Sequence, residues 1–218
     1  MQDFPKSDGR RVFVDGKQML SYNDGIYAKG SDFMSVRMAT LQDVPRILEI
    51  YGPYVEHTAI SFEYTVPTLE EFTQRFLKIT TQFPWLVWEE KGIVLGYAYG
   101  SLPFERAAYQ WNASASIYLC REACGKGIGR KLYAALEQLL QRQGYRKVYA
   151  VITTANEASV AFHKAVGYRY TATMPDCGYK FGAWYGTIWM EKELNTWDTP
   201  PREPVSIHQI KDLCCVDE

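Results

Sequence analysis

The chain has 218 residues, of which 47% are hydrophobic and 22% are charged, and its formal net charge at pH 7 is -1. This length and this apolar content predict one catalytic domain with a substantial core and with additional terminal segments. The near-neutral charge and the lack of a long Lys/Arg block argue against binding to nucleic acid or to anionic lipid.

The cysteines and the N-terminus predict a soluble, cytoplasmic protein with reduced thiols. The five cysteines are odd in number and lack the paired spacing of a zinc site or a disulfide framework, so no metal site is expected. Residues 1–11 are polar and lack the apolar core of a secretory signal, and the apolar runs elsewhere are short.

Residues 1–34 are rich in Asp, Gly, Lys and Ser, and they are predicted to form an N-terminal extension. Turn residues between aromatic residues at 22–27 indicate a small hairpin, with a flexible arm as the alternative. Domain-like patterning begins with a short strand at 36–38, after which Thr40 and Asp43 have the spacing of a capping box that starts a helix.

A second capping box predicts another helix, with apolar residues at helical spacing: Thr68 and Glu71 for the box, and Leu69, Phe72, Phe76 and Ile79 for the buried face. Apolar runs at 85–88 and 94–99 flank Glu90-Lys91-Gly92, which is typical of a β-hairpin. The first strands of the sheet are therefore expected to be antiparallel.

A strand at 113–119 leads into a glycine-rich loop, and the following helix, from about residue 130, ends at Gly144. A buried strand at 148–152 follows, so the two strands are expected to be parallel or locally splayed. A helix from Asn156 to Gly167 and two last strands, at 168–173 and 184–192, complete the predicted elements.

The most informative stretch is the loop Cys124-Gly125-Lys126-Gly127-Ile128-Gly129. Its glycines permit positive φ and close approach of a ligand, and the helix behind it offers unpaired N–H groups, so the loop is typical of phosphate binding. A purely structural turn is the alternative. A dinucleotide-binding turn is excluded because Arg130 and Leu132 stand where its last glycine would be, and the Walker pattern is absent.

The run from Asn156 to Tyr168 reads Asn-Glu-Ala-Ser-Val-Ala-Phe-His-Lys-Ala-Val-Gly-Tyr. It resembles the second signature of the GNAT acyltransferases, Asn-x-x-Ala/Ser-x-x-Leu/Phe-Tyr/His-x-x-x-Gly-Phe/Tyr. The first GNAT signature, Gln/Arg-x-x-Gly-x-Gly/Ala, is matched by Gly127 and Gly129, whereas Cys124 stands at the Gln/Arg position.

Three further segments, at 83–87, 104–111 and 178–185, resemble the phosphinothricin acetyltransferase-like branch of that family. The resemblance covers roughly residues 35–194, so residues 195–218, which contain three prolines and no clear period, are predicted to be a C-terminal tail. It implies a homodimer of the GNAT fold: an α/β fold with a mixed, mostly antiparallel central sheet flanked by helices, and with splayed strands at the acetyl-CoA site.

The family resemblance implies an acetyl-CoA-dependent N-acetyltransferase that releases CoA. It also implies the residues that hold acetyl-CoA, in the strand before the loop, in the loop, and in the helix after Asn156: Ile117, Tyr118, Leu119, Cys124, Gly125, Lys126, Gly127, Ile128, Gly129, Arg130, Asn156, Ser159 and His163.

The same resemblance implies catalytic roles. His163 stands at the place of the leaving-group acid, and a backbone amide near Leu119 is expected to polarise the thioester carbonyl. Ser114 aligns with the Glu that the branch uses as base. A serine cannot accept a proton at neutral pH without another base, but it can order a water that carries the proton away. Glu63 is the alternative base, unless it is an ordinary exposed acid.

For the acceptor, the branch implies a small amino-acid-like amine of the phosphinothricin or methionine sulfoximine/sulfone type. Arg106 and Tyr109 are expected to hold its carboxylate, because a guanidinium fork matches two oxygens, and Phe62, Glu63 and Trp184 are expected to line its pocket. The alternatives are another amine (a polyamine, an antibiotic or a peptide N-terminus) or a non-catalytic acetyl-CoA-binding module.

Overall fold

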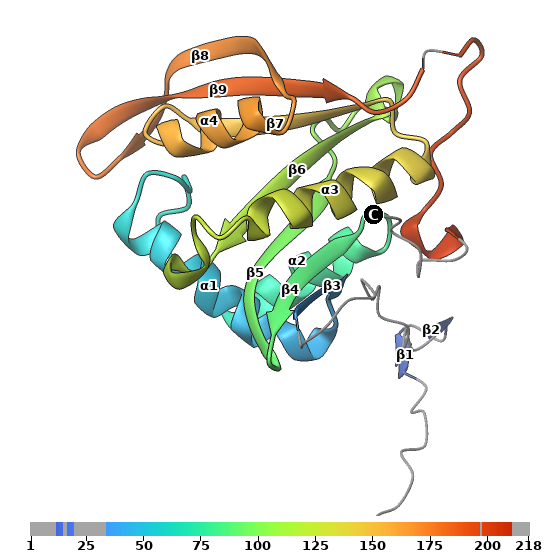
Figure 1. The fold of residues 1–218 in the computed structure, drawn as a ribbon, viewed down its shortest axis with the longest axis horizontal. Coiled ribbons are helices and arrows are strands. Elements are labelled where there is room, and N and C mark those ends of the chain that lie inside the picture. Colours follow the sequence, from blue (N-terminus) through green and yellow to red (C-terminus); the bar gives the residue numbers. More distant parts are fainter. Residues whose placement is uncertain (1–11, 15–16, 20–33, 197, 211–218) are drawn as a thin grey trace, which may run out of the picture.

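A computed structural model of the chain describes residues 12–14, 17–19, 34–196 and 198–210. These residues form a two-stranded sheet and a seven-stranded sheet with helices on both of its faces (Figure 1). The hairpin predicted at 22–27 lies outside the described residues. Within them, no helix is long and apolar enough to cross a membrane.

The large sheet has the strand order β3-β4-β5-β6-β7-β9-β8, in which β6 and β7 are parallel and all other neighbours are antiparallel. The mixed, mostly antiparallel α/β architecture is therefore confirmed. The strands of the two sheets are β1 (Val12–Val14) and β2 (Lys17–Met19), then β3 (Met34–Met38), β4 (Trp85–Glu90), β5 (Ile93–Ser101), β6 (Asn112–Leu119), β7 (Lys147–Thr153), β8 (Arg169–Lys180) and β9 (Ala183–Glu193).

Helices α1 (Val44–His57) and α2 (Leu69–Thr80) cover one face of the sheet, and α3 (Ile128–Gln143) and α4 (Glu157–Ala165) cover the other (Figure 1). The alternation of β4 separates the two cores. Trp85 and Val87 pack with α1 and α2, whereas Leu86 and Trp88 pack with α3. Because β4 is buried on both faces, its sequence is a continuous apolar run rather than an alternating one.

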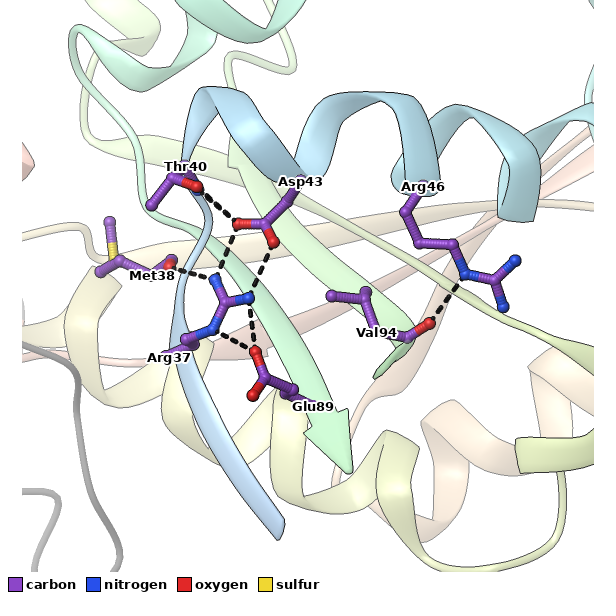
Figure 2. A network of polar contacts seen from close by, with 7 residues as sticks. All are labelled: Arg37, Met38, Thr40, Asp43, Arg46, Glu89 and Val94. Carbon is purple, nitrogen blue, oxygen red and sulfur yellow. Dashed lines mark hydrogen bonds and ion pairs between the residues drawn. The ribbon is translucent and has the colours of Figure 1, made fainter. Parts of the chain in front are cut away.

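A cluster of charged side chains, which we call the Arg37 cluster, joins β3 and β4 to the start of α1 (Figure 2). The Arg37 guanidinium donates two hydrogen bonds of 2.7 Å to Asp43 and bonds of 2.6 and 2.8 Å to Glu89. Asp43 also accepts from the N–H and the hydroxyl of Thr40, which confirms the predicted capping box. The cluster fixes the direction in which α1 leaves the sheet.

Two segments differ from the sequence-based expectation. Strand β8 continues to Lys180, beyond the predicted end at residue 173, because bulges after Tyr170 and Met174 absorb Pro175 without ending the pairing with β9. Residues 198–210, in the segment predicted to be a tail, run back over the domain: Ile207 is buried, and its N–H bonds to the carbonyl of Gln82.

Candidate functional site

The glycine loop between β6 and α3 requires its glycines for two different reasons. Gly125 and Gly127 have φ of +76° and +79°, a left-handed conformation that strains other residues, and the space beside them is open. Gly129 lies in the first turn of α3, where a Cβ would stand 3.4 Å from Ile117 and from Phe162. The loop therefore lets a ligand approach the N–H groups at the start of α3, which suits a phosphate.

Few side chains of this loop are placed to bind an anion instead of the backbone N–H groups. Lys126 and Cys124 are exposed, and the Cys124 thiol lies 3.6 Å from the carbonyl oxygen of Cys120. The Arg130 guanidinium extends toward α4, where it lies 3.4 Å from the carbonyl oxygen of Ala165. Backbone N–H groups, with Lys126 beside them, are thus the main groups that the loop offers to an anion.

Next to the loop, β6 and β7 are paired at one end only. Residues 112–114 pair with 147–149, after which the strands separate around a cavity of about 70 Å³. Because the N–H of Cys120 bonds to Leu95 of β5, and successive residues of a strand face opposite edges, the backbone groups of Ile117 and Leu119 face this opening. The splayed strands expected from the sequence are present.

The opening between the strands offers hydrogen-bonding backbone to an extended ligand. The carbonyl of Leu119 already accepts a 2.6 Å bond from the Tyr54 hydroxyl, so the N–H of Leu119 is the group it presents to a developing oxyanion. Burial raises the pKa of Tyr54, which keeps that hydroxyl a donor. Strand, loop and helix end thus supply complementary contacts along one path.

His163 is a buried side chain, 2% exposed, at the inner wall of the small cavity. Its Nδ1 lies 2.7 Å from the carbonyl oxygen of Ser159, and its Nε2 lies 2.9 Å from the Tyr133 hydroxyl. Burial lowers the pKa of His163, and the bond to the Ser159 carbonyl opposes that shift only in part. The imidazole is therefore held in a fixed orientation and is neutral near pH 7.

Asn156 and Ser159 line the same small cavity. Asn156 is the N-cap of α4, and its Oδ1 accepts a 3.1 Å hydrogen bond from the N–H of Ser159. Since this bond uses the side-chain oxygen, the amide NH₂ of Asn156 is the part of the cap that can reach a ligand.

A larger cavity of about 460 Å³ adjoins the small one. The two share Ile60, Tyr118, Val151 and Thr153 as lining residues. Phe62 and Glu63 line only the larger cavity, where Glu63 is the one acidic residue of the described lining. The Glu63 carboxylate pairs with Arg75 at 2.8 Å. This cavity can hold a small amine beside a carboxylate.

The segment that carries Phe62 and Glu63 is fixed to the end of the β8–β9 hairpin by contacts that the sequence did not indicate. The buried Lys180 donates to the carbonyl oxygens of Val55, at 2.6 Å, and of Ser61, at 2.7 Å. A Cβ on Gly178 would overlap the Phe62 ring, so glycine permits that contact. Burial lowers the pKa of Lys180.

Four side chains predicted to act in catalysis or in acceptor binding line neither cavity: Ser114, Trp184, Arg106 and Tyr109. Ser114 pairs with Ser101 and Tyr149 at the closed end of β6 and lines neither cavity. Trp184 is 62% exposed in the β8–β9 hairpin, where its ring contacts Tyr179 rather than the lining of either cavity. Ser114, which aligns with the Glu that the branch uses as base, is therefore not part of the lining of either cavity.

Arg106 and Tyr109 are exposed in the segment before β6. Strands rise about 3.3 Å per residue, so the start of β6 lies roughly 20 Å from Tyr118 at the cavities. The Tyr109 ring packs on Phe104, at 4.7 Å, and Phe104 stacks on Trp189 of β9. Within one chain, the structure therefore does not bring Arg106 and Tyr109 to the cavity that contains Glu63.

Comparison with known proteins adds to this geometry. A family described as "Acetyltransferase (GNAT) domain" matches residues 36–189. The chain is 30% identical over 177 residues to a phosphinothricin N-acetyltransferase of Streptomyces viridochromogenes, which covers 81% of this chain and 96% of that relative. It is 33% identical over 168 residues to an L-methionine sulfoximine/L-methionine sulfone acetyltransferase of Salmonella typhimurium. That match covers 77% of this chain and 98% of the relative.

A solved structure shares the fold as well as the sequence. The phosphinothricin acetyltransferase of Sinorhizobium meliloti, solved in complex with AcCoA, superposes with a TM-score of 0.74 at 36% identity. The match covers 79% of this chain and 95% of that protein.

Proposed function

Since the chain belongs to the GNAT acetyltransferase family and acetyl-CoA is its cosubstrate, we propose that it acetylates the amine of a small amino-acid-like acceptor of the phosphinothricin or methionine sulfoximine/sulfone type. The observation that carries this proposal is the pair of adjoining cavities. The smaller one lies in the opening between β6 and β7 beside His163, and the larger one contains Glu63.

The described residues fit acetyl-CoA, which supplies the acetyl group as a reactive thioester. The N–H groups at the start of α3, with Lys126, suit its pyrophosphate, because Gly125 and Gly127 leave the approach open. Backbone groups of Ile117 and Leu119, together with the Asn156 amide, suit the amide-bearing arm that must reach the small cavity. The N–H of Leu119 is placed to stabilise negative charge on the carbonyl oxygen.

The larger cavity suits a compact acceptor with a free amine. Glu63 attracts the ammonium form of such an acceptor, and Phe62 supplies an apolar wall. The volume of about 460 Å³ lies in the range of small-molecule sites. Because Glu63 is already paired with Arg75 and Ser114 lies at the closed end of β6, we assign Glu63 to binding and seek the proton acceptor near His163.

A homodimer would give Arg106 and Tyr109 a role that one chain does not. Both are exposed and distant from the cavity of their own chain, so they would hold an acceptor carboxylate only in the cavity of a second copy. Large exposed apolar side chains on the β8–β9 hairpin support such an interface: Tyr170, Met174, Tyr179, Phe181 and Trp184. A monomeric mass in sedimentation equilibrium would rule out this arrangement.

We place the reaction in the cytoplasm. Cys120, Cys124 and Cys177 are free thiols in the part of the chain that the structure describes, which suits a reducing compartment.

The test of the proposed function is release of the CoA thiol from acetyl-CoA with a panel of amines. We expect turnover with phosphinothricin, methionine sulfoximine and methionine sulfone, and a fall of about 10²- to 10⁴-fold in His163→Ala, because acid–base assistance is worth that much. Turnover only with polyamines or short peptides would contradict the acceptor class. Binding of acetyl-CoA without release on any amine would contradict catalysis.

A further inference from the structure

Tyr133 is a buried tyrosine of α3 to which the family resemblance assigned no role. It is 1% exposed, and its ring meets Phe162 and His163 edge-on, with centroids 5.2 Å apart in each case. Its hydroxyl lies 2.9 Å from Nε2 of His163 and 3.4 Å from the carbonyl oxygen of Ala115, and the residue lines the small cavity. The hydroxyl thus lies between the histidine and the opening of the sheet.

Both ring nitrogens of His163 are engaged by protein atoms. The carbonyl of Ser159 can only accept, so the 2.7 Å contact places a proton on Nδ1, and in the neutral ring Nε2 must accept from the Tyr133 hydroxyl. Consequently, although His163 lines the cavity, neither nitrogen can meet a substrate atom without displacing a partner.

The Tyr133 hydroxyl can serve both protonation states of His163. When the ring is neutral, the hydroxyl donates to Nε2. When the ring is charged, Nε2–H donates to the tyrosine oxygen, and the hydroxyl proton turns to the carbonyl of Ala115. An imidazolium buried to 2% exposure would otherwise leave an N–H without a partner, so this rearrangement is what makes the charged form accessible.

The charged groups around Tyr133 and His163 do not offer the proton another path. The titratable groups that face this pair are Glu137, one turn after Tyr133 on α3, Tyr99 of β5, and Tyr168 before β8, whose ring Lys192 of β9 approaches. Glu137 and Lys192 pair with each other at 2.6 Å. Burial raises the pKa of Tyr133, so the tyrosine passes a proton on but does not itself remain a phenolate.

We propose that Tyr133 is the relay through which His163 exchanges a proton with the reacting groups, an inference that rests on the proposed N-acetyltransferase function. As the amine attacks, the Tyr133 oxygen takes a proton from the amine nitrogen while its own proton passes to Nε2. The proton then returns from Nε2 to Tyr133, whose hydroxyl proton goes to the CoA sulfur. One N–H bond breaks, one S–H bond forms, and both side chains end as they began.

This relay supplies the base that Ser114 does not. The same imidazole accepts the proton of the amine and later returns it to the leaving group, so no carboxylate is needed at the closed end of β6. The shared walls of the two cavities, Tyr118 and Val151 among them, allow an amine in the larger cavity to approach the smaller one.

The test compares Tyr133→Phe, which keeps the ring, with Tyr168→Phe as matched control. Tyr168 is also buried, at 4% exposure, and meets the His163 ring edge-on, at 5.1 Å, but its hydroxyl does not bond to the imidazole. We expect kcat for CoA release to fall about 100-fold in Tyr133→Phe, with the KM for acetyl-CoA unchanged, and to change less than twofold in the control.

The kcat of a double variant distinguishes a relay from a structural role, because the effects of residues that act in series do not multiply. The double variant Tyr133→Phe/His163→Ala is expected to be no slower than the slower of the two single variants. Losses that multiply in the double variant, or a Tyr133→Phe enzyme with kcat within twofold of the wild type, would overturn the relay.

A titration separates this inference from the proposed function, because it needs no turnover. The chain has three histidines, so the ¹⁵N signals of the His163 ring can be followed by NMR against pH. Tyr133→Phe removes the acceptor of a charge-assisted bond, so we expect the pKa of His163 to fall by about one unit, while Tyr168→Phe leaves it in place. An unchanged pKa in Tyr133→Phe would refute the coupling even if the enzyme proved inactive on every amine.

Discussion

Two polar clusters of this molecule are equally well hydrogen-bonded but differ in what their groups can do. In the Arg37 cluster, the guanidinium places all five of its N–H donors on Asp43, Glu89 and the carbonyl of Met38 (Figure 2). Around His163, two neutral side chains share one hydroxyl proton between an imidazole nitrogen and a backbone carbonyl. The first cluster has one arrangement of protons near neutral pH, and the second has two.

A full set of hydrogen bonds therefore does not by itself mark a structural group. The Arg37 cluster joins groups that are charged near neutral pH, and none of its members lines either cavity. The His163 cluster can reverse the direction of a hydrogen bond, and it borders a cavity. We propose that reversibility beside a cavity is the property that separates the His163 cluster from the Arg37 cluster.

The largest effect on stability is expected from Arg37→Met. The substitution leaves Asp43 buried, with its side chain 10% exposed, and without its main partner. We expect the free energy of unfolding in urea to fall by about 3 kcal/mol, the scale for breaking a buried ion pair. Activity per folded molecule should stay the same, since the cluster lies away from the cavities.

Arg46→Met is the matched control for that substitution. Arg46 also bonds to a backbone carbonyl and to an acid, Val94 at 3.0 Å and Glu49 at 2.9 Å, but the two charged side chains are 40% and 66% exposed. Its loss should cost at most about 1 kcal/mol. Equal losses of stability in both variants, or a lower kcat in Arg37→Met, would contradict a purely stabilising role for the Arg37 cluster.

A smaller effect, on binding as well as stability, is expected from Lys180→Met. Lys180 is charged like Arg37, but its acceptors are the neutral carbonyls of Val55 and Ser61, which hold the segment with Phe62 and Glu63. Losing both bonds should cost about 2 kcal/mol in urea unfolding, because two buried carbonyls lose their donor. Since this segment walls the larger cavity, the acceptor KM should rise about tenfold.

Lys147→Met serves as control for Lys180→Met. Lys147 is a part-buried lysine at the closed end of β7 and pairs with Glu191 at 3.1 Å, away from the acceptor wall. It should leave both KM values unchanged, and Lys180→Met should leave the KM for acetyl-CoA unchanged. A rise in the acetyl-CoA KM in Lys180→Met would show that the hairpin contact supports the whole site rather than its acceptor side.

The fold was predictable because its signals are local. Thr68 and Glu71 start α2 through the capping box, Gly144 ends α3 with φ of +96°, and the apolar runs of β4 and β5 mark their hairpin. The extension of β8 to Lys180 was missed because bulges allow a strand to pass Pro175, which a two-residue period cannot represent.

The site was predictable where the chain itself brings residues together. The glycine loop, Asn156 and His163 belong to contiguous motifs, and in the structure Asn156 and His163 line the small cavity together with part of the strand that leads into the loop. Tyr133 and Lys180 were missed because their contacts join distant segments: the Tyr133 hydroxyl meets α4, and Lys180 meets α1. A tyrosine or lysine at helical or strand spacing carries no sign of such a partner.

The pH dependence of stability is expected to differ slightly between the wild type and Arg37→Met. Burial alone would raise the pKa of Asp43, but hydrogen bonds from Arg37 and Thr40 outweigh it and hold that pKa below its usual range. A lowered folded-state pKa contributes stability above the unfolded value of about 3.9, and that contribution is lost as pH falls through the folded pKa. The stability gap between wild type and Arg37→Met should therefore be full in the pH range where Asp43 is ionised in both proteins.

Below that range, the gap should narrow as Asp43 takes up its proton. In Arg37→Met, protonation of the unpaired Asp43 stabilises the folded state, whereas in the wild type protonation of the paired Asp43 destabilises it. The free energies of unfolding of the two proteins therefore converge as the pH falls. Urea midpoints measured from pH 7 to pH 3 would show this. A gap that stays constant to pH 3 would mean that packing of the Arg37 stem, rather than its charge, stabilises the cluster, and the contrast with His163 would then not rest on protonation.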